Sequence, residues 1–406
     1  MRFITSKRDF SKLIAKTNYM FNIIKEFKKE DFLGSSPPSV FVGSKLKYPE
    51  VNVGILSPPA EVEEAWIYDA PNTWVQQDLS MEEIAQLRAS LINSRFKSNV
   101  YEVKKSSKFL EISQEIGMAS KPVDVEIKLN KTPNIRFDFE KIAMPTGPIG
   151  ELKQVKILGN TKIDIKVEKV FSDTDLKATE ALTYLYESGF DENTLSKLLS
   201  IGVLGLKKNR KLVPTRFSIT ATDDILGKEL IKKIKNYNAI NDYLLYQGSY
   251  FGNYYFILMF PEVWQYELFE GYLPRSLWNF GNEIKFAIDY ESLFGRSYYA
   301  QTTAGGYYAS RISVLEHLVR LKRQASCLVI RFETPEYKIP LGVFVVRSAA
   351  RKTLTNNSEK FNSKEELINH AKELIKTKFN YNMQSLLEQS KVIKSLNQIK
   401  LTKYFN

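Results

Sequence analysis

The sequence of 406 residues is 43% hydrophobic and 13% aromatic, which is enough to bury a large core spread over about two or three domains. Lys and Arg outnumber Asp and Glu by 58 to 46, and the charge of +12 favours a polyanion over acidic proteins or metal-rich sites as the partner. The single cysteine, Cys327, excludes an intrachain disulfide, a Cys-based zinc site and an iron–sulfur cluster within one chain.

The chain begins without the apolar stretch and small-residue cleavage site of a signal peptide. No later apolar run approaches the length that spans a bilayer. One cysteine is also typical of a reducing compartment. We therefore expect a cytoplasmic protein with no membrane partner.

The first half of the chain mixes helical and extended patterns. Ser80 and Glu83 form a capping-box pattern, which predicts a helix that starts at Met81. Alternating apolar residues predict strands at Val123–Leu129 and, after a Gly-Asn turn, at Ile163–Val167. Further strands are expected within residues 40–43 and 48–59, and further helices over residues 10–27, 175–188 and 192–200.

The second half continues the mixture. Strands are expected at residues 254–260, 327–332 and 343–347, with a helix over 311–321 and a second capping box, Ser363 with Glu366, opening a helix to about 376. Residues 380–397 are polar and rich in Lys, Gln and Ser, which indicates a tether. These patterns predict an α+β fold of mixed sheets with flanking helices, in two intimately packed domains.

The last residues form a short motif of defined spacing. Gln398 is followed by Leu401 at the fourth position and by Tyr404 and Phe405 at the seventh and eighth. One tight helical turn brings the last three to one side as an apolar plug, while the Gln amide enters a separate small pocket. This is the pattern of a peptide that binds the PCNA sliding clamp. The alternative is a last amphipathic turn that packs on the protein's own core.

Several longer strings are specific enough to compare with a known family. They are FVG at 41–43, YPEVNVG at 48–54, DAP at 69–71 with Trp74, VPTRFSITATDD at 213–224, GGYYASR at 305–311 and PLGVFVVR at 340–347. These strings resemble the Nre family of archaeal DNA-repair proteins, and the resemblance runs over nearly the whole chain.

The resemblance implies a role in tolerance of DNA damage, partnership with the clamp and an archaeal source. It divides the chain into an Nre-like N-terminal domain over 1–285 and an Nre-like C-terminal domain over 286–378, before a flexible tether over 379–397 and the clamp peptide over 398–405. Residues before Phe41 contain no Cys or His, so the zinc-finger-like segment that many members carry has no counterpart here. The cofactor, if any, is unknown.

The string from Val213 to Asp224 has two interpretations. It reads as an apolar strand entering a turn, with Asp223 or Asp224 capping a helix that runs to Lys235. The alternative is that the two adjacent carboxylates are catalytic, holding a metal or activating water. On such a strand Arg216 and Ser218 would face the same side, where the guanidinium could contact phosphate.

Basic and aromatic residues interleave between Lys207 and Phe256, a mixture that can bind phosphates and stack on bases. Aromatic residues at this density are also typical of a strand in a core. His317 and His370 have no neighbouring His or Cys, so neither is expected to hold a metal. The candidate DNA contacts are Arg216, Lys207, Lys208, Arg210, Lys211, Tyr250, Arg311 and Arg347.

Three functions follow from the sequence. The first is a clamp-recruited protein that binds damaged DNA. The second is a DNA-processing hydrolase, a nuclease or a glycosylase that flips a nucleotide into a pocket. The third is a non-enzymatic adaptor between the clamp and other repair factors.

Overall fold

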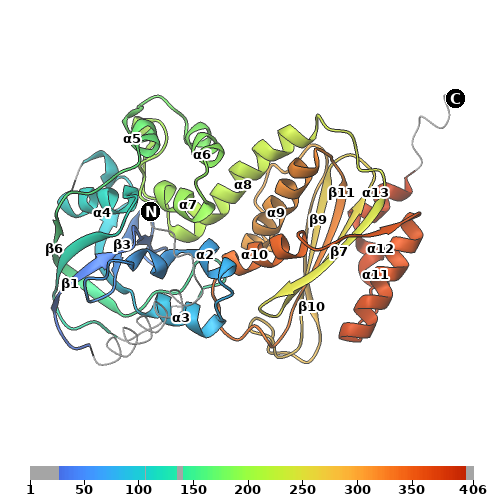
Figure 1. Cartoon of the computed structure of the whole chain (residues 1–406), viewed down its shortest axis with the longest axis horizontal. Helices are drawn as coiled ribbons and strands as arrows, with labels where there is room; N and C mark the ends of the chain where they lie inside the picture. The colour runs from blue at the N-terminus through green and yellow to red at the C-terminus, as the bar shows by residue number, and fades with distance from the viewer. Residues whose placement is uncertain (1–26, 106, 135–139, 399–406) are drawn as a thin grey trace. The chain divides into compact units, whose positions relative to one another are not determined.

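The computed structural model describes residues 27–105, 107–134 and 140–398, and the chain divides into two compact units (Figure 1). Unit 1 comprises Met1–Leu226 and Ile339–Phe344, and unit 2 comprises Gly227–Lys338 and Val345–Asn406. Within the described residues, each unit contains one mixed sheet of six strands with flanking helices. This confirms the predicted α+β class. The division expected between residues 285 and 286 falls inside a strand of the second sheet.

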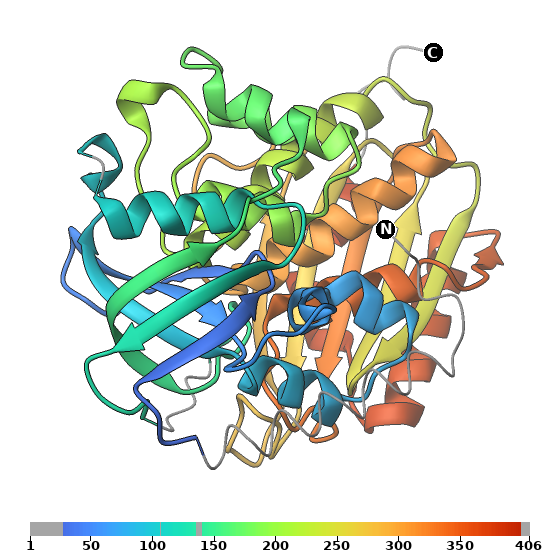
Figure 2. The same cartoon turned by 60° about the vertical axis from the view of Figure 1, so that its left-hand side comes forward.

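The sheet of unit 1 has the order β1-β5-β6-β4-β3-β2, and its neighbours are antiparallel except for the parallel pair β4 and β6. Figure 2 shows its twist, with α4 packed against β2, β3 and β6. The strands are β1 Asp31–Ser36, β2 Val40–Val42, β3 Glu50–Ser57, β4 Ile92–Asn99, β5 Val123–Leu129 and β6 Ile149–Leu158. The helices are η1 Ala65–Asp69, α2 Pro71–Gln76, α3 Met81–Ala89, η2 Glu102–Lys104, α4 Lys108–Met118, α5 Ile165–Ser172, α6 Ala178–Glu187, α7 Glu192–Ser200, η3 Lys207–Asn209 and α8 Thr215–Ile234, the last of which continues into unit 2.

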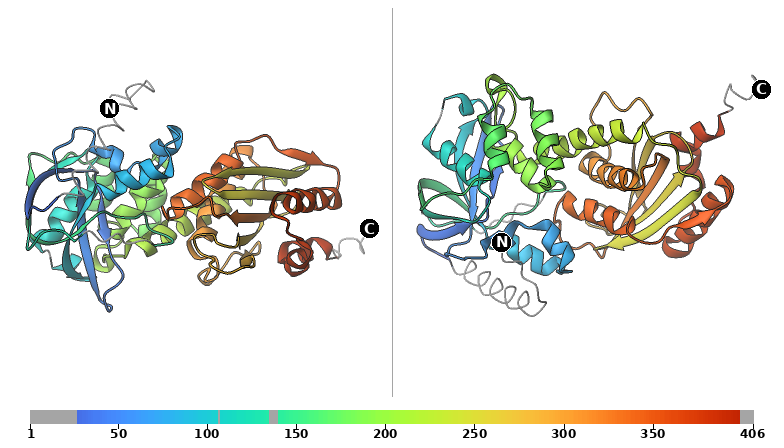
Figure 3. Two further views of the ribbon diagram at one scale, coloured as in Figure 1. Left: turned by 90° about the horizontal axis from the view of Figure 1, so that it is seen from below. Right: turned by 45° about the horizontal axis from the view of Figure 1, so that its top comes forward.

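The sheet of unit 2 has the order β10-β9-β11-β8-β7-β12, and only β9 and β11 pair in parallel among its described strands. Helices α9 and α10 lie on one face and α11 to α13 on the other (Figures 1 and 3). The strands are β7 Tyr243–Tyr250, β8 Asn253–Phe260, β9 Gln265–Tyr272, β10 Lys285–Glu291, β11 Ser326–Glu333 and β12 Glu359–Phe361. The helices are α9 Ala304–Leu321, α10 Val343–Thr353, α11 Lys364–Phe379, α12 Gln384–Gln389 and α13 Lys391–Asn397.

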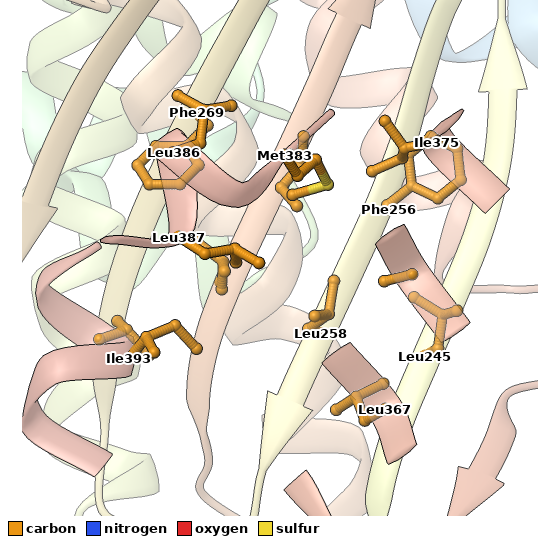
Figure 4. Close-up of a cluster of buried hydrophobic side chains, with 14 of the residues drawn as sticks. Leu245, Phe256, Leu258, Phe269, Leu367, Ile375, Met383, Leu386, Leu387 and Ile393 are labelled. Carbon is orange, nitrogen blue, oxygen red and sulfur yellow. The ribbon is translucent and has the colours of Figure 1, made fainter. Parts of the chain in front are cut away.

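The face of this sheet under α11 to α13 is an apolar core. Period-two alternation on β8 points Phe256, Leu258 and Phe260 to this face, and the helices cover them with residues such as Leu367 and Ile375 (Figure 4). Burial of this apolar surface is the main force that holds α11 to α13 on the sheet.

The opposite face, under α9, carries buried charges. Arg311 of α9 donates from Nη1 to Glu291 Oε2 of β10 at 2.7 Å, and Trp264 donates from Nε1 to Glu291 Oε1 at 3.1 Å. Both side chains of the ion pair are at most 1% exposed. Since a buried charge is tolerated only with a partner, each residue requires the other.

Several local predictions are confirmed. Ser80 Oγ accepts from Glu83 N and the Glu83 carboxylate accepts from Ser80 N, so the capping box at α3 is complete. The Ser363 cap of α11 is also present. The alternation over Val123–Leu129 matches β5, and the predicted strands at 254–260 and 327–332 match β8 and β11. The helix expected over 10–27 lies almost wholly outside the described residues.

Two strand predictions in unit 1 are wrong. Ile163–Val167 is not a strand, because the Asp164 carboxylate accepts from Lys166 N and starts α5 at Ile165. The segment from Val213 to Asp224 is mostly the first half of α8, so Asp223 and Asp224 lie within that helix and do not cap it. Its β-branched residues are accommodated by back-bonding, as in Thr220 Oγ1 donating to Phe217 O at 3.1 Å.

Two predictions near the C-terminus are also wrong. Residues 343–347 belong to α10, since a run of consecutive buried apolar residues fits a helix as well as a strand. Residues 384–397 form α12 and α13 where a tether was expected. Although this stretch is polar overall, its few apolar residues are buried: Leu386, Leu387, Val392 and Ile393 join the apolar core together with the preceding Met383.

The ion pair beneath α9 gives a stability test. Glu291→Gln removes the charge at almost constant volume and leaves the buried Arg311 without the carboxylate that balances it, so we expect a loss of about 3–5 kcal/mol in the free energy of unfolding. The exposed pair of Glu229 and Lys232, also in unit 2, is the control, and Glu229→Gln should change stability by less than about 0.5 kcal/mol. Equal effects in denaturant titrations would contradict the structural role of the buried pair.

Candidate nucleic-acid interface

The connection from α7 to α8 is held firmly in unit 1. Leu212 N donates to Val100 O at 2.8 Å, and Val213 N donates to Ser200 O at 2.9 Å. Gly202 and Gly205 take φ values of 70° and 95°, a backbone region that favours glycine. The connection therefore presents its exposed side chains from a defined position.

A wide groove of about 1010 Å³ runs beside this connection. Lys207, Lys208 and Lys104 line it together with Phe171, which is 37% exposed, and with the single carboxylate of Asp175. Lysines that outnumber acids and an exposed ring are the components that bind phosphates and stack on bases.

Arg210 lies in the wall of this groove. Its guanidinium is buried and donates to Gly205 O and to Asp173 O, both at 2.8 Å, while it lies 5.3 Å from the centre of the Phe171 ring. Burial lowers the pKa of Arg210, and nearby Asp173 opposes that shift. Arg210 thus positions Phe171 and the loop, and its hydrogen bonds point inward.

A second, smaller groove of about 290 Å³ is also lined by residues of the connection. Its lining includes Lys211, Pro214 and two exposed aromatic rings, Tyr48 at 66% and Phe217 at 49%. The Arg216 guanidinium lies 5.2 Å from the centre of the Phe217 ring. The Tyr48 hydroxyl is hydrogen-bonded to the Tyr101 hydroxyl, which links the groove to the loop before η2.

We call the two grooves, together with the connection that helps to line them, the basic-aromatic surface. Its cations are Lys104, Lys207, Lys208, Lys211 and Arg216, and its aromatic rings are Tyr48, Tyr101, Phe171 and Phe217. Of the eight predicted DNA contacts, four lie on the connection, among them the buried Arg210, and a fifth, Arg216, lies in the first turn of α8.

The other three predicted DNA contacts lie in unit 2 and are buried. Arg311 is 1% exposed in its ion pair with Glu291, and Arg347 is 7% exposed on α10. Tyr250 stacks on Phe251 with 4.0 Å between ring centres, and Lys352 Nζ lies 4.4 Å from the Tyr250 ring. Such packing does not favour direct contact with a phosphate backbone.

The two predicted catalytic carboxylates lie side by side in sequence on α8. Asp223 is fully buried and Asp224 is partly buried. In the described part of the chain, no group of three or more His, Cys, Asp or Glu side chains is arranged to hold a metal ion.

None of the described helices is long and apolar enough to cross a membrane.

The histidines pack against other side chains. His317 lies 3.0 Å from the Tyr246 hydroxyl through Nε2, and burial, with a contribution from Arg320, lowers its pKa to about 4. His370 lies 3.0 Å from a carboxylate oxygen of Glu359. Both arrangements tie helices to the sheet of unit 2.

A buried ionic cluster lies elsewhere in unit 1, at the end of η1. The Asp69 carboxylate accepts from Arg88 at 2.9 Å, from Lys197 at 3.1 Å and from Asn193 at 3.3 Å. Burial favours the neutral acid, but Lys197 and Arg88 outweigh burial and hold the pKa of Asp69 below its usual value. The cluster joins η1, α3 and α7, which are far apart in the sequence.

Two family patterns match the chain over most of its length. "Archaeal Nre, N-terminal" matches residues 7–279 and "Archaeal Nre, C-terminal" matches residues 291–404. The chain belongs to the archaeal Nre family. This confirms the resemblance drawn from the strings between Phe41 and Arg347.

Curated members of the family are similar along most of their lengths. DNA repair protein NreB of Archaeoglobus fulgidus is 38% identical over 340 residues, which is 84% of each chain. DNA repair protein NreA of Haloferax volcanii is 37% identical over 327 residues, covering 79% of this chain and 78% of its own. NreA of A. fulgidus is 38% identical over 360 residues, covering 88% and 89%. No solved structure matches.

Sequence reasoning missed several residues of the basic-aromatic surface and of the Asp69 cluster. Tyr101, Lys104 and Phe171 join the basic-aromatic surface from segments remote from residues 207–217. Asp69 belongs to a string that was noted, but its partner Lys197 lies 128 positions away. Residues this far apart in the sequence come together only in the folded chain, so no local sequence pattern could identify them.

The Asp69 cluster predicts a pH-dependent stability. Because the folded-state pKa is lowered, the contribution of Asp69 is complete above its unfolded pKa of about 4 and disappears as the pH falls through the folded value. Asp69→Asn should therefore destabilise the protein at pH 7, with a difference from wild type that shrinks below about pH 4.

The control is Glu126→Gln on β5, whose carboxylate is 36% exposed and 3.9 Å from Lys128. It should leave the free energy of unfolding nearly unchanged across the range. A difference between wild type and Asp69→Asn that grows on acidification would show that the carboxylate is not held ionised.

Proposed function

We propose that this chain is a DNA-repair protein that binds DNA through the basic-aromatic surface and is recruited to it by a sliding clamp through residues 398–405. The observation that carries DNA binding is the convergence of exposed cations and rings, from four segments of unit 1, around residues 207–217. Repair is supported by the relatives, which are named DNA repair proteins.

Lysines and aromatic rings contribute in different ways on such a surface. Each lysine that neutralises a phosphate releases a condensed counterion, which gives affinity without sequence preference. Exposed rings stack on unpaired bases and add about 1–3 kcal/mol per base. The combination suits DNA that carries an unpaired or damaged base next to duplex.

The lysine contribution can be measured with a charge-matched control. Replacing Lys207, Lys208 and Lys211 by Ala should weaken duplex binding and reduce the slope of log affinity against log salt by up to about 2.7, or 0.9 for each lost phosphate contact. Replacing Lys128, Lys153 and Lys156, exposed lysines of β5 and β6, removes the same charge from outside the two grooves. Equal losses in fluorescence anisotropy would argue for diffuse attraction and against a defined surface.

Recruitment rests on the terminal motif and on how the chain leads into it. Helix α13 is held on the sheet of unit 2, where the Glu267 carboxylate accepts from Ser390 Oγ at 2.5 Å, Lys391 N at 2.9 Å and Val392 N at 3.1 Å. Gln265 donates to Ser395 Oγ at 3.0 Å. The motif thus begins one residue after an anchored helix, at Gln398, while Leu401, Tyr404 and Phe405 lie outside the described residues.

This anchoring separates clamp binding from folding in a truncation series. A chain that ends at Asn397 keeps the whole apolar core of unit 2, so we expect an unchanged melting temperature and no binding to the clamp in a titration calorimeter. A chain that ends at Met383 also loses α12 and α13, which exposes the core and should lower the melting temperature by several degrees. Clamp binding by the chain that ends at Asn397 would refute the assignment of the motif.

A further inference from the structure

A pocket of about 310 Å³ lies in unit 1, apart from the residues assigned above to DNA contact. Four helices end or begin at it: α4 ends there, and α2, α5 and α7 begin there. Its volume is at the lower limit of cavities that hold small molecules.

Part of the pocket wall is aromatic and apolar. Trp66 and Phe190 are both partly exposed and contribute aromatic rings, and prolines 37, 38 and 71 complete the apolar lining. Aromatic and proline faces of this kind favour a planar ring over an extended chain.

The polar groups of the pocket combine donors and acceptors. Lys197 has three N–H donors, one of which goes to Asp69 at 3.1 Å. The Asp69 carboxylate accepts in addition from Arg88 and Asn193, so it fixes the ammonium in place. Asp164 and Asp191 cap the starts of α5 and α7, where they accept from Lys166 N and Thr194 N, and each carboxylate has further lone pairs for a ligand in the lining.

The charge of the lining selects against anions. Its charged groups are three carboxylates, Asp69, Asp164 and Asp191, and one ammonium, Lys197, and because Asp69 is paired with Lys197 and Arg88, the carboxylates of Asp164 and Asp191 set the charge that a ligand meets. A phosphate or carboxylate ligand would be repelled. A neutral planar heterocycle with N–H donors and a carbonyl acceptor matches the walls, the carboxylates and the ammonium together.

We infer that this pocket binds a nucleobase, held between its aromatic walls and read by Lys197 and by the two aspartates at the helix starts. The pocket neighbours the wide groove, since α4 contributes Gln114 to the groove and Gly117 to the pocket. A base rotated out of DNA bound on the basic-aromatic surface is one source of the ligand, which rests on the proposed function. A free nucleoside is the other source.

The inference carries a base preference. Adenine, cytosine and guanine have an exocyclic amino group that donates to carboxylates, whereas thymine has none. A site that pairs such donors should bind adenosine, cytidine or guanosine about tenfold tighter than thymidine, since thymidine has no amino group to donate to a carboxylate of the lining.

The test uses the full-length protein in two arms. In the first arm, a duplex with 2-aminopurine at a mismatch reports base extrusion by a rise in fluorescence, while anisotropy reports duplex binding separately. In the second arm, calorimetry measures binding of the four free nucleosides. Phe190→Ala removes a wall of the pocket, and Thr73→Trp fills it without removing any contact described here. Phe190→Tyr, with a retained ring, is the control that should preserve binding.

Extrusion that is lost in Phe190→Ala and Thr73→Trp, with duplex affinity retained, supports an extrahelical base as the ligand. Nucleoside binding lost in the same variants, without extrusion, supports the pocket with a free nucleoside as its ligand. Duplex binding with neither signal overturns the inference and leaves the proposed function intact. If the wild type does not bind duplex, the proposed function fails, and the nucleoside arm alone decides the pocket. If Phe190→Ala does not fold, Thr73→Trp carries both comparisons.

Discussion

Arg331 in the middle of unit 2 is the charge around which that unit is organised. Its guanidinium donates to Glu270 of β9 at 2.6 Å, to Asn253 of β8 at 2.6 Å and to Glu333 of its own strand, β11, at 3.0 Å. Burial alone would lower the pKa of Arg331, but Glu270, Tyr255 and Glu333 outweigh it and raise the pKa. Three adjacent strands, β8, β9 and β11, are thereby tied through one cation.

The same network sets how closely α9 approaches the sheet. A Cβ on Gly306 would lie 2.0 Å from Glu270 Oε1, so only glycine allows the helix to rest on that carboxylate. One turn earlier, Asp289 accepts from Thr303 N and Thr303 Oγ1, both at 2.9 Å, and fixes the start of α9. The string GGYYASR at 305–311 is therefore explained by packing: a glycine over Glu270 and an arginine on Glu291. The resemblance of this string to the family is therefore accounted for by packing within unit 2, and no contact with DNA is needed to explain it.

Strand β9 shows how one alternating sequence serves both faces. Glu270 faces α9, whereas Glu267, three residues earlier, faces the other side and caps α13. Burial raises the pKa of Glu267, and the donors from Ser390, Lys391 and Val392 oppose that shift. The chain thus uses buried carboxylates to position helices on each face of the sheet, and the apolar core under α11 to α13 supplies the area that offsets their desolvation.

Structural features that depend on residues close together in the sequence could be predicted from the sequence. The capping box at Ser80, the helix cap at Ser363 and the alternation of β5 were readable because their determinants lie within a few residues. The string at 213–224 was not, because its β-branched residues favour a strand locally while the fold requires a helix there. The helices at 384–397 were hidden for a related reason: a few buried apolar residues among polar ones decide the structure, and composition does not show which are buried.

In the candidate sites too, near neighbours in the sequence were readable and residues brought together by the fold were not. The sites also show which residues account for the charge of +12 that a partner meets. The cations Lys207, Lys208 and Lys211 could be read from the sequence as one basic loop because they are nearly contiguous, whereas the rings of Tyr48, Tyr101 and Phe171 come from three other segments. Arg88, Arg311 and Arg331 are each compensated by a buried carboxylate, so they contribute little to the field outside the protein. A polyanion therefore meets mainly the charge of exposed lysines. The net excess of 58 basic over 46 acidic residues indicates only a basic protein, whereas lysines that lie beside exposed aromatic rings are the feature that favours nucleic acid.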